Sequence, residues 1–296
     1  LTHFFAGAAE AKVLQEYSDT LGIKKLDLAV DWGKISWILT KPLFFVLHSV
    51  YSVVGNFGVA ILIVTLMLKI LFFPLTNRSF VTMAKMKNLQ PMMKELQERH
   101  KDDRVELQKQ MMQLYQKEKV NPLAGCLPML LQIPVFWSFY KVMFTTIEMR
   151  QAPFFGWVHD LSARDPTSIL NLFGFLPYDL PIWLTQGTFA IISIGAWPLI
   201  MGASMFVQTR LNPPPPDPSQ RIVFAMMPLI FMVMLASFPV GLVIYYTWNN
   251  LLTITQQYII MRRMGTPIDL TQAIGIKAAA RFFSGLRPPA SRKGER

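Results

Sequence analysis

Long apolar segments are the feature of this sequence that most limits what it can fold into. Five of them stand out, at residues 55–76, 122–147, 188–208, 221–238 and 239–260. Each approaches the roughly 20 apolar residues that an α-helix needs to cross the hydrocarbon core of a bilayer. Only 16% of the residues are charged, against about 25% in a soluble domain. The sequence therefore predicts an all-α integral membrane protein with five transmembrane helices.

The first of these segments contains one charge. Between Gly58 and Leu75, Lys69 is the only charged residue, and a charge that faces lipid near the middle of a bilayer costs about 2.5–3.5 kcal/mol. Thr65 lies four residues earlier and so on the same face of a helix, which favours a polar stripe. We therefore expect Lys69 to face a polar interior, with extension of its side chain toward the nearer interface as the alternative.

Most of the other polar side chains in the predicted spans are neutral. Gln132 lies in the second span, and Asn249, Asn250 and Thr253 lie in the last one with several further Thr and Gln residues. Such residues either hydrogen-bond to neighbouring helices or, together with Lys69, line a wet groove, and their spacing leaves both possibilities open. The spans lack paired carboxylates, and the chain has one Cys and four scattered His residues. No enzyme, cofactor or metal site is predicted.

The charges between the spans predict an orientation. Residues 77–121 hold ten Lys or Arg against six Asp or Glu, and residues 261–296 hold eight against two. The connection at 148–187 holds two basic residues against four acidic ones. Basic residues stay on the cytoplasmic side of a membrane, so 77–121 and 261–296 are expected in the cytoplasm and 1–54 and 148–187 outside.

The segments outside the spans have distinct patterns. Residues 32–54 are apolar but interrupted by Trp32, Pro42 and two lysines, which favours a helix lying in the interface. Residues 209–220 form a proline-rich link, which we expect to be stiff. The tail is basic and rich in Gly, Pro, Ser and Ala, and we expect it to bind anionic lipid or RNA. Its candidate contact residues are Arg281, Arg287, Arg292 and Lys293.

Residues 77–121 predict an antiparallel helical hairpin. Apolar residues recur at helical spacing on both sides of an interruption at His100–Asp103, and Asp103 with Glu106 resembles a capping box that opens the second helix. The apolar face of this hairpin is rich in methionine, at Met83, Met86, Met93 and Met111. Two interpretations remain open, a solvated spacer and an adaptable surface for apolar segments.

Several motifs occur in a fixed order along the chain. They are Phe73-Pro74-Leu75-Thr76, Met83-Ala84-Lys85-Met86, the run from Asn121 to Pro128, the run from Gln132 to Phe136, and Phe238-Pro239-Val240-Gly241-Leu242. In sequence and spacing they resemble the YidC family of membrane protein insertases, specifically its Gram-negative branch. The resemblance extends from about Phe4 to Arg263, and residues 1–31 resemble the end of the family's periplasmic domain. We therefore expect a longer protein to carry a further span and most of that domain before Leu1.

The resemblance implies a site and a function. It implies a groove that opens to the cytoplasm and the lipid, is closed toward the periplasm, and has a positive residue at the position of Lys69. The family usually has Arg there, and Lys keeps the charge but lacks the planar fork of donors. The residues assigned to this groove are Lys69, Thr65, Gln132, Tyr245, Tyr246 and Asn249.

The implied activity is insertion of nascent membrane proteins into the bacterial inner membrane, alone or with the Sec translocon. The hairpin methionines would contact the substrate or components of the signal recognition particle pathway, and the basic tail would contact the ribosome. Two other classes of function stay open, a secondary transporter and a non-catalytic assembly scaffold. An internal repeat, which is typical of transporters, is not visible among the five predicted spans.

Overall fold

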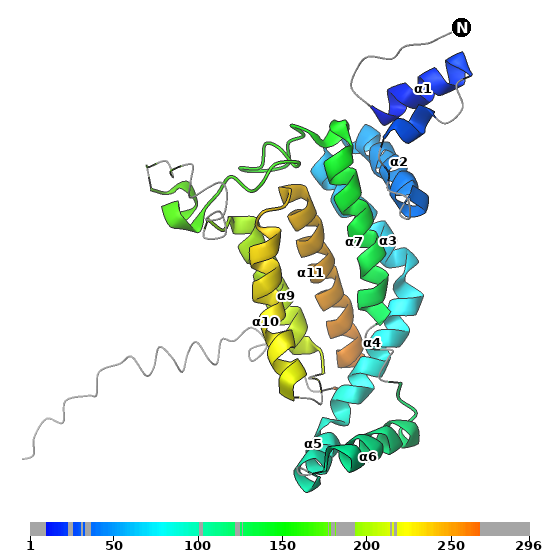
Figure 1. Ribbon diagram of the computed structural model, residues 1–296, viewed down its shortest axis with the longest axis vertical. Coiled ribbons are helices and arrows are strands. Elements are labelled where there is room, and N and C mark those ends of the chain that lie inside the picture. Colours follow the sequence, from blue (N-terminus) through cyan, green and yellow to red (C-terminus); the bar gives the residue numbers. More distant parts are fainter. Residues whose placement is uncertain are drawn as a thin grey trace, which may run out of the picture.

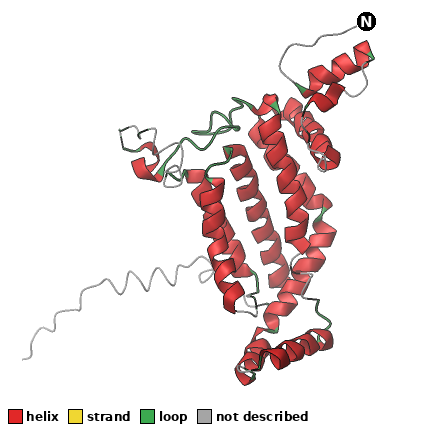
Figure 2. Cartoon of the chain, viewed as in Figure 1, coloured by secondary structure: helices red, strands yellow, loops and turns green. Residues whose placement is uncertain are grey.

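In the part of the chain that the computed structural model describes, all regular secondary structure is helical (Figure 2). Described are residues 10–22, 26–30, 32, 37–100, 103–121, 125, 127–176, 178, 181, 193–213, 215 and 218–266. Within these ranges the structure contains helices, turns and loops and no β-strand. This confirms the predicted all-α class.

One long helix lies at the centre of the bundle. This helix, α11, packs against α9 on one side and against α3, α4 and α7 on the other, while α10 packs on α9 and α2 packs on α3 and α7 (Figure 1). The helices in chain order are α1 (Ala11–Leu21), η1 (Leu26–Ala29), α2 (Trp37–Val54), α3 (Phe57–Leu71), α4 (Phe73–Asn88), α5 (Gln90–Arg99), α6 (Arg104–Lys117), α7 (Leu127–Thr145), η3 (Ile147–Met149), η4 (Ile169–Gly174), α9 (Ala196–Leu211), α10 (Pro218–Leu235) and α11 (Val240–Arg263).

Helices occur within all five predicted spans, but their bounds differ from the prediction. The third span was expected to begin at residue 188, and 188–192 lie outside the described residues. One helix, α7, is by itself long and apolar enough to cross a membrane, and the bent pair α3 and α4 would give a second. A part of α2 and a part of α10 are shorter apolar helices. The membrane boundaries of five spans therefore stay a prediction.

The apolar segment at 55–76 is not one straight helix. The chain bends by 70° between α3 and α4, at Phe72. Pro74 in the first turn of α4 has no N–H to donate and cannot continue α3. The Phe72 carbonyl oxygen at the bend accepts hydrogen bonds from both the backbone N–H and the hydroxyl of Thr76, each at 3.0 Å.

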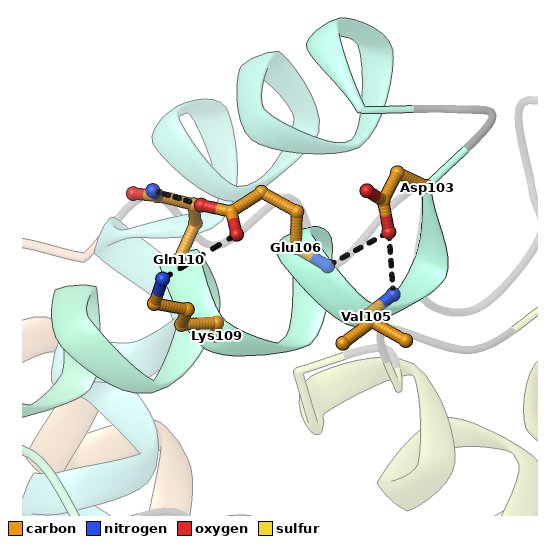
Figure 3. Close-up of polar contacts among 5 residues, drawn as sticks. All are labelled: Asp103, Val105, Glu106, Lys109 and Gln110. Carbon is orange, nitrogen blue, oxygen red and sulfur yellow. Dashed lines mark hydrogen bonds and ion pairs between the residues drawn. The ribbon is translucent and has the colours of Figure 1, made fainter.

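The predicted hairpin is formed by α5 and α6, which pack against each other. Asp103 caps α6, and its Oδ1 accepts hydrogen bonds from the backbone N–H groups of Val105 and Glu106, each at 3.0 Å (Figure 3). The reciprocal half of the predicted capping box is wrong. The Glu106 carboxylate instead accepts from Gln110 Nε2 at 2.7 Å and pairs with Lys109 at 3.6 Å, because residues three and four positions on are its neighbours on the helix.

Candidate functional site

A cavity of about 470 Å³ lies where the bent pair α3 and α4 meets α7, α9, α10 and α11. All six residues that the sequence assigned to a groove line it. Further polar residues of the lining are Thr76, Gln208, Thr209, Asn212, Asn250 and Thr253. Among the described residues of the lining, Lys69 is the only charged one, so the cavity has a neutral polar wall with a single positive charge.

Lys69 is half-buried and lines this cavity. Its Nζ donates a hydrogen bond to Thr253 Oγ1 at 2.7 Å, and the Thr253 hydroxyl in turn donates to the Asn249 carbonyl oxygen at 2.7 Å. An ammonium group has three donors, so two remain for water or for a ligand. Among the residues that the structure describes, no carboxylate forms an ion pair with Lys69.

Aromatic packing fills the bundle beside the cavity, toward the N-terminal end of α11. Tyr245 is buried, its ring stacks on Phe139 with centroids 4.1 Å apart, and its hydroxyl accepts a hydrogen bond from Gln132 Nε2 at 2.6 Å. Tyr246 lies between Phe136 of α7 and Phe231 of α10. The cavity is therefore closed on this side by rings, and its polar residues continue toward α4.

The polar residues of α11 have two roles. Tyr245, Asn249 and Thr253 follow one another at intervals of four residues and face the cavity. Asn250, which also lines the cavity, donates to Ser204 Oγ of α9 at 3.2 Å, and Gln257 donates to Asn212 Oδ1 at 3.0 Å. Both possibilities that the sequence left open are thus realised in one helix.

Two residues of the site were not among the six assigned to the groove. Thr253, the acceptor for Lys69, was named only among the polar residues of the last span whose role stayed open, although it follows Asn249 at the same four-residue spacing. Thr76 lies after the bend, in α4, and Gln256 Nε2 of α11 donates to its hydroxyl at 3.0 Å.

The methionines assigned to a contact surface are mostly buried. Met93 and Met111 lie inside the hairpin with Tyr115, and Met83 packs with Phe80 and Ile260. In this conformation the two helices of the hairpin cover Met93 and Met111, whereas Met83 also lines the cavity. Met86 is partly exposed, and its contact role stays a prediction. The four basic residues assigned to ribosome contact lie outside the described residues.

Comparisons with known proteins agree with one another. A family model described as 60Kd inner membrane protein matches residues 49–267, and a model of the YidC periplasmic domain matches residues 1–46. A protein of Beijerinckia indica named membrane protein insertase YidC is 57% identical over 270 residues, which cover 91% of this chain and 44% of that protein. A protein of the same name from Methylorubrum extorquens is 56% identical over 266 residues, covering 90% of this chain and 42% of that protein. The chain thus spans less than half the length of these curated relatives.

A solved structure has the same fold. It is described as an active YidC insertase crystal structure with the first transmembrane domain resolved, and it matches with a TM-score of 0.57 and 24% sequence identity. The match covers 83% of this chain and 52% of that one.

Proposed function

This chain belongs to the YidC family of membrane protein insertases, and from that membership we propose that it inserts nascent membrane proteins into the bacterial inner membrane. In this proposal the substrate arrives from the cytoplasmic side. Its polar segment enters the cavity beside Lys69, and its apolar segment passes between the helices into lipid. The protein acts alone or together with the Sec translocon, and no covalent chemistry is involved.

The physical problem in insertion is the removal of water from polar groups. A polar tail that crosses the hydrocarbon core must give up hydrogen bonds to water, and each unsatisfied backbone group costs several kcal/mol. A cavity lined with hydroxyl and amide groups offers replacement partners inside the protein. Apolar residues of α7 and α10 that line the cavity are also partly exposed at the surface, among them Met129, Ile133 and Met234. They offer a path from the cavity to lipid.

The observation that carries the proposal is the charge of Lys69, which has no carboxylate partner among the described residues. Within that part of the chain, its ammonium group has one hydrogen-bond acceptor, the Thr253 hydroxyl. An acidic side chain of a substrate would complete the set of hydrogen bonds, and a charge-assisted hydrogen bond contributes about 1.5–3 kcal/mol. We infer that the site favours substrates whose translocated tail carries Asp or Glu.

The test is insertion into liposomes that contain the full-length protein. Substrates with acidic and with neutral tails are compared for wild type, Lys69→Ala and Lys69→Arg. We expect Lys69→Ala to slow insertion of the acidic tail about tenfold, the equivalent of roughly 1.4 kcal/mol, and to leave the neutral tail nearly unchanged. Lys69→Arg keeps the charge and is expected to resemble wild type.

The matched control is Lys85→Ala, which removes an exposed lysine of α4 that does not line the cavity. Insertion of the acidic tail at the same rate by Lys69→Ala and wild type would refute the electrostatic role. The same liposomes separate the other classes of function, because solute flux would indicate a transporter, and neither insertion nor flux a scaffold.

A further inference from the structure

A compact apolar turn projects from the connection between α7 and α9. It consists of residues 169–176 together with Tyr178, and no charged residue occurs between Asp165 and Asp179. Phe175 is 89% exposed, although it is one of the largest apolar side chains. The other exposed apolar side chains of the turn are Ile169, Leu172, Phe173, Leu176 and Tyr178.

Hydrogen bonds hold this turn in one shape. The Phe173 N–H donates to the Ser168 carbonyl oxygen at 2.7 Å, and the Leu176 N–H to that of Asn171 at 3.2 Å. The Asn171 side chain accepts from the Gly174 N–H at 3.1 Å, and the Tyr178 hydroxyl donates to the Leu170 carbonyl oxygen. Polar groups are thus used within the turn, while the large apolar side chains face outward.

The backbone of the turn is strained at its apolar residues. Leu172 and Phe173 have φ angles of 49° and 60°, in the left-handed region that non-glycine residues seldom adopt. Such a conformation costs of order 1–3 kcal/mol per residue. The surrounding hydrogen bonds hold it, and its effect is to present both side chains at the surface.

The turn is attached firmly to the helical bundle. The Ile169 N–H donates to the Ile194 carbonyl oxygen at 2.9 Å, just before α9. Asp165 Oδ2 accepts from the Trp197 N–H in the first turn of α9 at 2.8 Å, and Arg164 Nε donates to the Ser237 carbonyl oxygen after α10 at 3.0 Å. Figure 1 shows the turn to the side of the bundle, at the level of the upper ends of α10 and α11.

We propose that this turn is inserted into the bilayer leaflet at the α9 and α10 end of the bundle. By the predicted orientation this is the outer leaflet. The family is one of integral membrane proteins. The last two turns of α10, which end close to the Ser237 carbonyl that Arg164 contacts, also carry exposed apolar side chains, at Leu229, Ile230 and Met234. Exposed apolar patches without charge are costly in water. In lipid the same side chains are solvated and the satisfied backbone groups carry little penalty.

The consequence is a fixed depth for one edge of the protein. The turn is bound before α9 through Ile169, and the segment leading into it is bound to α9 through Asp165 and to the end of α10 through Arg164. Insertion of the turn would therefore hold the ends of these helices at a set distance from the membrane surface. Interfacial apolar elements lie about 5–10 Å into the boundary between headgroups and acyl chains.

The test places a spin label on Phe175→Cys in a background in which the single cysteine, Cys126, is replaced by Ser. The protein is reconstituted in vesicles of phosphatidylcholine and phosphatidylglycerol, and collision rates with oxygen and with a water-soluble nickel chelate are measured. Oxygen concentrates in lipid and the chelate in water. We expect oxygen to dominate at residue 175, at a depth of about 5–10 Å below the phosphates. Since Phe175 is almost fully exposed, its replacement leaves the packing of the turn unchanged.

The control is Val105→Cys on α6, a residue that is apolar and 79% exposed but lies on the charged hairpin. There the nickel chelate is expected to dominate. Equal exposure of residues 175 and 105 to the chelate would overturn the proposal. So would a label at 175 that is water-exposed in pure lipid vesicles and becomes shielded only in native membranes, because this would indicate a protein partner. A second label at Leu172→Cys must report the same environment as residue 175.

Discussion

At the scale of single residues, the polar surroundings of Lys69 were predictable, because a charge that faces lipid costs a large free energy. A charge within an apolar segment is stable only in a polar environment, and this follows from the sequence without any knowledge of the fold. Thr65, Gln132 and Asn249 joined it from helical spacing and family motifs, and all line the same cavity. The hydrogen bond from Lys69 to Thr253 was not predicted, because pairing between two helices depends on their relative rotation, which periodicity does not determine.

Glu148 is a residue whose role emerged only from the structure. It follows α7 in η3, and its Oε1 accepts a hydrogen bond at 3.2 Å from the N–H of Ala11, the first residue of α1. Its other oxygen is buried and has no hydrogen-bond partner among the described residues. Burial raises the pKa of this carboxyl above its usual value, and the nearby Glu10 raises it further.

The raised pKa of Glu148 predicts that α1 is bound more tightly in acid. The folded state favours the protonated carboxyl, so its contribution to stability is fully present below the unfolded pKa of about 4.3 and is lost as the pH rises through the folded pKa. Hydrogen-exchange protection of the α1 amides, corrected for intrinsic rates, should therefore fall as the pH rises above the unfolded pKa of about 4.3 and through the raised pKa of the folded state. In Glu148→Gln this fall should be absent, while Glu10→Gln should only shift it to lower pH. An unchanged fall in Glu148→Gln would contradict the assignment.

At the scale of helices, the sequence predicted the elements better than their geometry. The hairpin, the cap at Asp103 and the central last helix follow from local patterns that act within a few residues. The 70° bend between α3 and α4 was missed, although Pro74 signals a helix boundary. Hydropathy alone suggested one continuous span, because it does not register the lost N–H donor. The bend lies within the site, since Lys69 precedes it and Thr76, which accepts a hydrogen bond from Gln256 of α11, follows it.

The stability of the hairpin can be tested with two neighbouring methionines, one buried and one exposed. Met111 is buried against the α5 face, whereas its neighbour Met112 is 50% exposed. Met111→Ala should destabilise the hairpin by about 2 kcal/mol, the low end for removal of a buried methionine, because this small core can partly collapse. Met112→Ala should change the stability by no more than about 0.5 kcal/mol. Thermal unfolding of the full chain, followed by exchange of α5 and α6 amides, measures both.

The same pair tests the contact role of the hairpin. If the hairpin binds a partner in its closed form, the exposed Met92 and Met112 are the methionines that contact it, and Met112→Ala should weaken binding without loss of stability. Weaker binding by Met111→Ala alone, in proportion to its stability loss, would indicate that the hairpin only needs to be folded.

At the scale of the whole molecule, α11 connects the other helices through side-chain hydrogen bonds. It reaches α3 through the bond from Trp248 Nε1 to the Leu62 carbonyl oxygen at 3.2 Å, and α4 and α9 through Gln256 and Asn250. Among the described helices, α11 is not one of those apolar enough by themselves to cross a membrane, although the sequence predicted a span at 239–260. A helix with this many polar residues is stable in a membrane only when neighbouring helices supply partners. The sequence showed that partners were needed, but the arrangement of the helices determines which ones they are.

The predicted orientation of the molecule in the membrane follows from the distribution of its charges alone. The excess of basic residues in 77–121, ten against six acidic ones, should keep the hairpin in the cytoplasm, because a translocated lysine or arginine must cross against its hydration energy and the membrane potential. A membrane-impermeant maleimide applied to cells with a permeabilised outer membrane should label His159→Cys, an exposed residue of the connection after α7. Val105→Cys should react only after the inner membrane is opened. The Cys126→Ser background without a new cysteine must remain unlabelled. Labelling of residue 105 in intact cells would reverse the topology and with it the side from which a substrate enters the cavity.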